Sequence, residues 1–172
     1  MANRQAIGSA GELVAQARLM VRGWIVGNVN TGGMKNAPAI DLLAAKDKRT
    51  VRLAVKTTGH TSSDVQWNAK FGWSSLFKGD VVPDYVIFVW FDDAKDLDHC
   101  RVFVVPSKTV DRDVRKAHEH WHSHPRKDGA ARAQGDHVGI SWRGKDTKGN
   151  IAYNFANKWK QYENAWNLLE RR

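Results

Sequence analysis

Hydrophobic positions along the chain follow two patterns, one typical of helices and one typical of strands. Leu13, Val14, Ala17 and Met20 recur at helical spacing, and Ser9 precedes Glu12 by three residues as in a capping box. Elsewhere β-branched and aromatic residues form short continuous runs, which predict strands. The predicted helices span residues 9–22, 107–122 with Ser107 as cap, and 154–170. The predicted strands span residues 24–29, 38–45, 51–58, 84–91, 101–105 and 137–143.

The order of these elements predicts the fold class. Along the chain, the predicted order is a helix, three strands, an irregular segment, two strands and a helix. A short strand and a final helix follow. The run 84–91 is apolar throughout, which indicates a strand covered on both faces, with 101–105 antiparallel to it. We expect residues 59–78 to form a loop and a short helix, and 123–136 a loop. The pattern predicts a single α/β domain over residues 1–172, with a mixed central β-sheet flanked by helices.

Composition narrows the class of protein. The chain has 172 residues, 42% of them hydrophobic and 26% charged, which is typical of a globular domain. No apolar run reaches the roughly 20 residues of a membrane span, and the first residues lack the apolar core of a signal peptide. Cys100 is the single cysteine, so no internal disulfide forms. We therefore expect a cytoplasmic protein without membrane contact.

The segment 38–58 is the best candidate for a functional site. It predicts a hairpin of two apolar strands, with Asp41 in the first and Lys56 near the end of the second. An ionised group in a buried strand is costly unless a partner compensates it. If the register places Asp41 beside Lys56, the pair suits a metal-dependent phosphodiesterase. Asp41 would hold Mg²⁺, and Lys56 would orient the attacking water or neutralise charge on the phosphate.

These residues resemble a known family. Gly11 and Glu12 on a first helix, Asp41 in an apolar strand after Pro38, and Lys56 on the next strand look like the PD-(D/E)XK nucleases. The layout is most similar to the archaeal-type Holliday-junction-resolvase-like branch. The resemblance implies a restriction-endonuclease-like fold and metal-dependent DNA cleavage. It assigns Asp41 and Glu12 to a Mg²⁺ or Mn²⁺ site, together with the backbone carbonyl of Val55, and Lys56 to catalysis. Because resolvase-like members are often dimers, a homodimer is an expectation as well.

One position departs from the family pattern. The family has Glu, Asp or sometimes Gln two residues before the lysine, and this chain has Ala54. Three interpretations stay open: a nuclease with a reduced site, a DNA-binding relic without catalysis, or a substitution introduced to inactivate the enzyme. Two further alternatives concern the remaining residues. Glu12 can serve only as the capping partner of Ser9, and Asp41 and Lys56 can form a plain cross-strand ion pair.

A second motif points to different chemistry. His118, Glu119 and His122 satisfy the H-E-x-x-H pattern of zinc proteases, in which the two histidines share Zn²⁺. Ser123 and Pro125 end the predicted helix soon after the motif, so the context is poor. A zinc protease is therefore a remote alternative. Binding of Zn²⁺ or Ni²⁺ through these histidines remains an expectation.

Net charge favours a polyanionic partner. The formal charge is +9, from 27 Lys and Arg against 18 Asp and Glu, which suits DNA bound through its phosphates. No base-reading module is recognisable, so we expect recognition of backbone and shape. A basic scaffold protein is the alternative. The candidate DNA-binding residues are Lys35, Arg52, Arg126, Lys127, Arg132 and Arg143.

Overall fold

The computed structural model describes residues 4–29, 40–59, 64–68, 82–93, 96–126, 128–131, 137–142 and 154–171. It contains the helices α1 (Arg4–Met20), α2 (Ser107–Ser123) and α3 (Phe155–Lys158), and the 3₁₀ turns η2 (Lys160–Tyr162) and η3 (Trp166–Glu170). The strands are β1 (Ile25–Asn28), β2 (Leu42–Lys46), β3 (Arg49–Thr58), β4 (Asp64–Asn68), β5 (Tyr85–Asp93), β6 (Asp96–Pro106) and β7 (His137–Ser141). Among the described residues, no helix is both long and apolar enough to cross a bilayer.

A mixed five-stranded sheet forms the centre, in the order β1-β2-β3-β5-β6. The first three strands are antiparallel neighbours, β3 and β5 run parallel, and β6 returns antiparallel to β5. The predicted α/β class, the hairpin of β2 and β3, and the pairing of β5 with β6 are confirmed. Asp47 adopts a positive φ of 54° in the hairpin turn, a conformation that Asp tolerates better than most residues.

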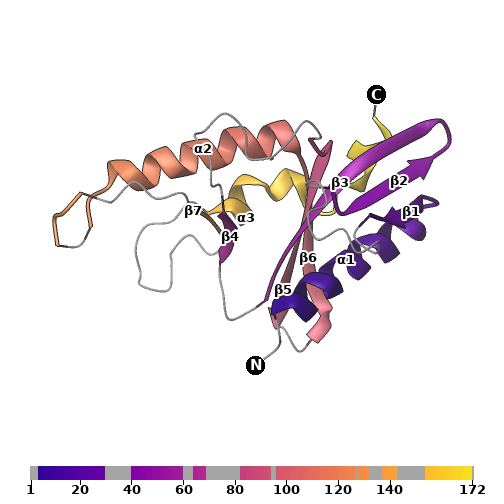
Figure 1. Cartoon of the computed structure of the whole chain (residues 1–172), viewed down its shortest axis with the longest axis horizontal. Helices are drawn as coiled ribbons and strands as arrows, with labels where there is room; N and C mark the ends of the chain where they lie inside the picture. Colours follow the sequence, from indigo (N-terminus) through magenta and orange to yellow (C-terminus); the bar gives the residue numbers. More distant parts are fainter. Residues whose placement is uncertain are drawn as a thin grey trace.

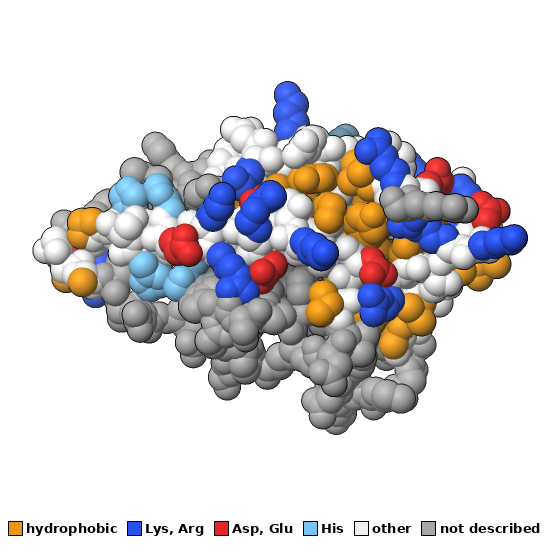
Figure 2. Space-filling model, turned by 90° about the horizontal axis from the view of Figure 1, so that it is seen from above, with side chains coloured by type: hydrophobic (Ala, Val, Ile, Leu, Met, Phe, Trp, Pro, Cys, Tyr) orange, Lys and Arg blue, Asp and Glu red, His pale blue; other side chains and the backbone are white. Residues whose placement is uncertain are grey.

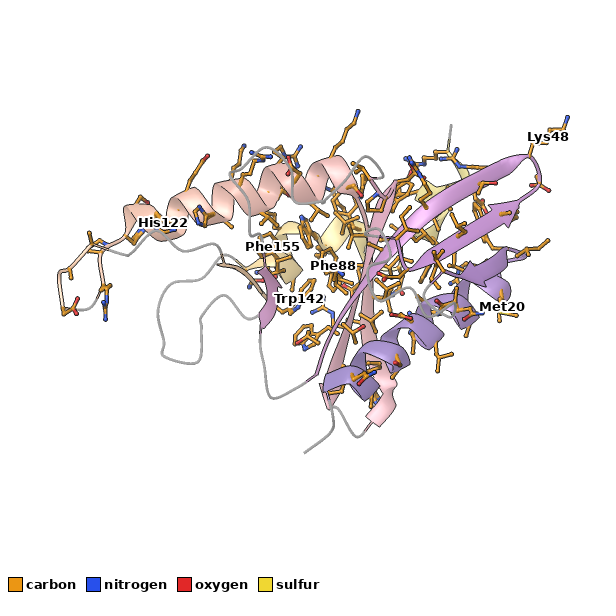
Figure 3. The ribbon with its side chains drawn as sticks, viewed as in Figure 1. Met20, Lys48, Phe88, His122, Trp142 and Phe155 are labelled. Atoms are coloured by element: carbon orange, nitrogen blue, oxygen red, sulfur yellow. The ribbon has the colours of Figure 1, made fainter. Side chains whose placement is uncertain are left out.

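Helices α1 and α2 lie on opposite sides of the sheet (Figure 1). On the α1 side, the core joins Leu19 to strand residues such as Leu53 and Ile87. On the α2 side, Val114 packs with an aromatic cluster that includes Phe88, Trp142 and Phe155, labelled at the centre of Figure 3. Residues Val86 to Phe91 of β5 are buried without interruption, because both faces of this strand are covered.

Two helix starts differ from the prediction. Helix α1 begins at Arg4, so Ser9 lies inside the helix and does not cap it. Pro106 is the N-cap of α2, and no side chain caps that end, so Ser107 is the first helical residue and not the cap. Helix α1 thus begins five residues before Ser9, whereas α2 begins at the predicted residue and only its cap differs.

The predicted helix 154–170 is wrong. Asn154 does cap a helix, its side chain accepting the N–H of Asn157, but α3 ends at Lys158 and 3₁₀ turns follow. Asn164 N–H donates to the Val102 carbonyl at 2.8 Å, so the segment passes along the edge strand β6. Trp159 belongs to the α2-side core and Trp166 to the α1-side core. The apolar residues whose spacing predicted one face of a long helix therefore pack against both faces of the sheet.

The segment 59–78 contains a strand where we predicted a loop and a short helix. Strand β4 pairs antiparallel with β7 in a separate two-stranded sheet, with Asp64 opposite Ser141. The predicted strand 137–143 is confirmed as β7. Strand β4 has no clear sequence period because its pairing partner lies more than 70 residues further along the chain.

Candidate active site

Asp41 lies directly before β2, between β1 and β3. Its carbonyl accepts the Val29 N–H at 2.9 Å, and its own N–H donates to the Leu53 carbonyl at 2.9 Å. Its carboxylate oxygen Oδ2 accepts the backbone N–H of Val55 at 2.6 Å. The hairpin therefore holds the Asp41 carboxylate against the strand residue that separates Ala54 from Lys56.

Ala54 and Lys56 share one face of β3, since strand side chains alternate. Leu42 pairs with Leu53 in the last pair of the β2–β3 ladder, directly after Asp41. Ala54 is only 1% exposed and packs in the α2-side core, whereas Lys56 is half-buried. The ladder ends at the Leu42–Leu53 pair, and the Asp41 N–H donates to the Leu53 carbonyl, so the placement of Asp41 on the face of Lys56 stays a prediction.

Glu12 approaches the same end of the hairpin from α1. The side-chain amide of Asn28 donates to Glu12 Oε2 at 3.2 Å. Asn28 is the last residue of β1, pairs with Leu42, and precedes the Val29 N–H that binds Asp41. Because Ser9 does not cap α1, the interpretation of Glu12 as its capping partner is wrong.

Asn28 was missed at the sequence level. A signal was present, since Asn28 is a polar residue near the end of an apolar strand, as Asp41 is. A continuous set of contacts thus leads from Glu12 through Asn28 and Val29 to Asp41 and Val55. Glu12 reaches this end of the hairpin from the α1 side of the sheet, whereas Lys56 follows Ala54 on the face of β3 that packs toward α2.

The donor chemistry fits a hard divalent cation. Mg²⁺ takes oxygen ligands, usually one or two carboxylates with several waters. Glu12 and Asp41 supply two carboxylates, and Ala54 supplies no donor. No group of three or more His, Cys, Asp or Glu side chains suited to a metal occurs within the described part of the chain. The contact given for Val55 is through its N–H, so its carbonyl as a ligand stays a prediction.

The structure describes two of the six predicted DNA-binding residues, Arg52 and Arg126. Arg52 forms a bidentate pair with Asp84, in which Nη2 lies 2.8 Å from Oδ1, and its backbone N–H donates to the same carboxylate. Burial alone would raise the pKa of Asp84, but these bonds from Arg52 outweigh it and hold the pKa below its ordinary value. Arg126 is exposed, and its Nε lies 3.7 Å from Oδ2 of Asp128. Four candidates lie outside the described residues, namely Lys35, Lys127, Arg132 and Arg143.

The H-E-x-x-H motif lies at the end of α2. His118 Nε2 and His122 Nε2 are 2.8 Å apart, as helical spacing predicts. The helix ends at Ser123, directly after the motif, with His124 in an extended conformation. Within the described residues no third acidic, His or Cys side chain completes a metal site there. The geometry thus lacks the three protein ligands of a catalytic zinc site.

Comparison with solved structures bears on the fold. No protein-family model matches the chain, and no curated protein matches it. The chain is similar in structure to a bacterial homing endonuclease, I-Ssp6803I, with a TM-score of 0.50 and 12% sequence identity. The match covers 98% of this chain and 92% of that chain. The sheet and its flanking helices are therefore those of a nuclease-like α/β fold.

Proposed function

We propose that this chain is a metal-dependent DNA endonuclease with its active site at Glu12, Asp41 and Lys56. The observation that carries the proposal is that the end of β1 contacts both Glu12 of α1, through Asn28, and Asp41, through Val29, while Asp41 also accepts the Val55 N–H of β3. The structural similarity to a homing endonuclease and the charge of +9 support DNA as the substrate. The PD-(D/E)XK resemblance supports the assignment of the residues.

Each residue has a distinct role in this proposal. Glu12 and Asp41 hold Mg²⁺ or Mn²⁺, and the Val55 carbonyl is a further candidate ligand. The ion would supply an acidified water and positive charge near the scissile phosphate. In this proposal Lys56 neutralises phosphate oxygens as charge develops or orients the attacking water. Asn28 is a positioning residue, because its amide fixes Glu12.

A catalytically inert DNA-binding relic is the second candidate. The burial of Ala54 in the apolar core, beside Val86 and Phe88, favours it. At that position the family's acid would have to lie partly within the core. A nuclease with a weakened site and an introduced inactivating substitution are the two other interpretations of Ala54. All three predict DNA binding, but only the weakened nuclease predicts cleavage by the unaltered chain.

Cleavage assays separate these candidates. We expect Mg²⁺- or Mn²⁺-dependent nicking of plasmid, linear or branched DNA by the unaltered chain. Asp41→Asn and Lys56→Gln should each lower the rate by roughly 10²–10³, as expected when a group that stabilises transition-state charge is lost. Lys48→Gln, in the hairpin turn at the far end of β2, is the matched control and should leave the rate unchanged.

The cleavage and binding assays together also distinguish a DNA-binding relic from a nuclease. DNA binding without cleavage on every substrate, with both metals, would favour the relic over the nuclease. Cleavage that survives Asp41→Asn and Lys56→Gln would contradict the assigned site. A chain that neither binds nor cleaves DNA would refute both candidates.

A further inference from the structure

The projecting end of α2 carries two pairs of histidines with helical i, i+4 spacing. His118 pairs with His122, and His120 pairs with His124. The two pairs differ by about half a helical turn, so they lie on opposite flanks of α2. Figure 2 shows histidine side chains on both flanks of this end. The end is remote from the hairpin, since His122 and Lys48 lie at opposite ends of the molecule in Figure 3.

The first pair has the geometry of a chelate. His118 Nε2 and His122 Nε2 approach to 2.8 Å, and their ring centroids are 4.1 Å apart. With metal–nitrogen bonds of about 2.0–2.1 Å, this separation corresponds to a ligand–metal–ligand angle of roughly 90°. Square-planar and octahedral ions have that angle, and Cu²⁺ and Ni²⁺ prefer such geometries with imidazole ligands. Zn²⁺ prefers tetrahedral angles, which need the two nitrogens further apart.

The surroundings are compatible with a cation. Arg115 lies one turn before His118 on the same flank of α2. It is paired with Asp111, with Nε 2.9 Å from Oδ2 and Nη2 3.1 Å from Oδ1. Its charge is therefore largely compensated. His122 is half-buried, so its ring has solvent access for water ligands to complete the coordination.

The second pair provides an internal comparison. His124 is the C-cap of α2 and has left the helical conformation, with ψ at 123°. Its Nδ1 lies 2.7 Å from the His120 carbonyl oxygen, to which it must donate because a carbonyl only accepts. Its ring is thus tied to the helix end. In this pair the close ring-nitrogen contact is with the backbone, whereas in the first pair it joins the two rings.

We propose that His118 and His122 form a surface site for a late first-row divalent cation, with Cu²⁺ and Ni²⁺ preferred over Zn²⁺. Both Nε2 atoms bind the ion, and each neutral ring keeps its proton on Nδ1. This site is separate from the Glu12 and Asp41 carboxylates, which suit Mg²⁺.

The test is calorimetric titration of NiCl₂ into the full chain, without any affinity tag. Excess MgCl₂ keeps the carboxylates from contributing. We expect one Ni²⁺ per chain, with His118→Gln and His122→Gln each weakening binding at least tenfold. His120→Gln and His124→Gln are the matched controls, and they should change affinity less than twofold.

Electron paramagnetic resonance with CuCl₂ gives a second readout. We expect coupling to two imidazole nitrogens in the unaltered chain and to one in either His118→Gln or His122→Gln. Circular dichroism confirms that each variant is folded. Absence of binding, or an equal loss in the two pairs, would overturn the proposal. A Zn²⁺ affinity above that of Ni²⁺ would overturn the stated preference.

Discussion

Ala54 is the residue at which the resemblance to PD-(D/E)XK nucleases and the packing of the core lead to different expectations. In the resemblance to PD-(D/E)XK nucleases it would take the position of the second acid, and it lies on the face of β3 that carries Lys56. It is also packed into the α2-side core. The single side chain therefore faces both the candidate site and the apolar interior. A substitution can distinguish which of these surroundings dominates.

We predict that Ala54→Glu raises Mg²⁺- or Mn²⁺-dependent DNA cleavage by roughly tenfold or more, since a third carboxylate can share the metal with Asp41. Adding Asp41→Ala should abolish the gain. DNA binding should weaken only slightly, from the added negative charge. A nicking assay and a thermal melt on the same purified protein provide the measurement.

Packing of Ala54 in the core predicts the opposite result for Ala54→Glu. If Ala54 belongs only to the interior, the new carboxylate is buried without a partner and costs about 3 kcal/mol or more, with no activity gained. Ala54→Met adds similar volume without charge and serves as the control. Loss of stability with Glu but not with Met, together with no cleavage, would contradict the nuclease centre.

At the scale of elements, the placement of α1 on β3 decides whether Glu12 reaches the site. Gly11 lies directly over Thr57, and a Cβ at Gly11 would overlap the Thr57 side chain. The missing side chain lets the helix backbone approach the strand next to Lys56. Gly11 is thus explained by packing, and its neighbour Glu12 by the site that this packing brings together.

We predict that Gly11→Ala destabilises the protein by about 1–3 kcal/mol, because overpacking forces α1 away from β3. The same displacement should withdraw Glu12 and lower cleavage. Gly8→Ala is the matched control: the added Cβ meets nothing within 4 Å, so helix propensity should stabilise the protein by about 0.5–1 kcal/mol. Urea unfolding measures both.

The partner of Gly11 offers a further check. The double variant Gly11→Ala with Thr57→Ala should recover part of the lost stability, since the overlap involves the Thr57 hydroxyl and methyl groups. No recovery in the double variant, or an equal effect of Gly8→Ala, would show that close packing against Thr57 is not the cause.

At the scale of the whole molecule, the charge of +9 is the basis of the proposed association with DNA. We predict that affinity falls by about 10³ or more between 50 and 200 mM salt, if six or more phosphates are neutralised. Lys56→Gln should lower the slope of log affinity against log salt by about one, whereas Lys48→Gln should leave it unchanged. Fluorescence anisotropy in Ca²⁺ or without metal measures binding alone. A slope near zero would remove DNA as the partner.

The homodimer stays a prediction. Leu13, Met20, Val21 and Ile25 are exposed apolar residues on and after α1, and Met20 is labelled at the outer side of that helix in Figure 3. They are the surface on which self-association can be examined by sedimentation.

The sequence by itself determined the strands whose neighbours are close in the chain. The hairpin of β2 and β3, the pair β5 and β6, and helix α2 follow from local periodicity and turns. Asp41 and Lys56 were found the same way, because a charged residue in an apolar strand stands out. These features depend on short segments whose burial pattern is regular.

Tertiary structure decided the rest, because the causes lie far apart in the chain. Strand β4 exists through pairing with β7, and the C-terminal segment breaks into short turns because its aromatic residues pack on both faces of the sheet. The contact of Asn28 with Glu12 depends on α1 lying against the sheet. Local propensity cannot specify such contacts, since their free energy comes from surfaces that meet only after folding.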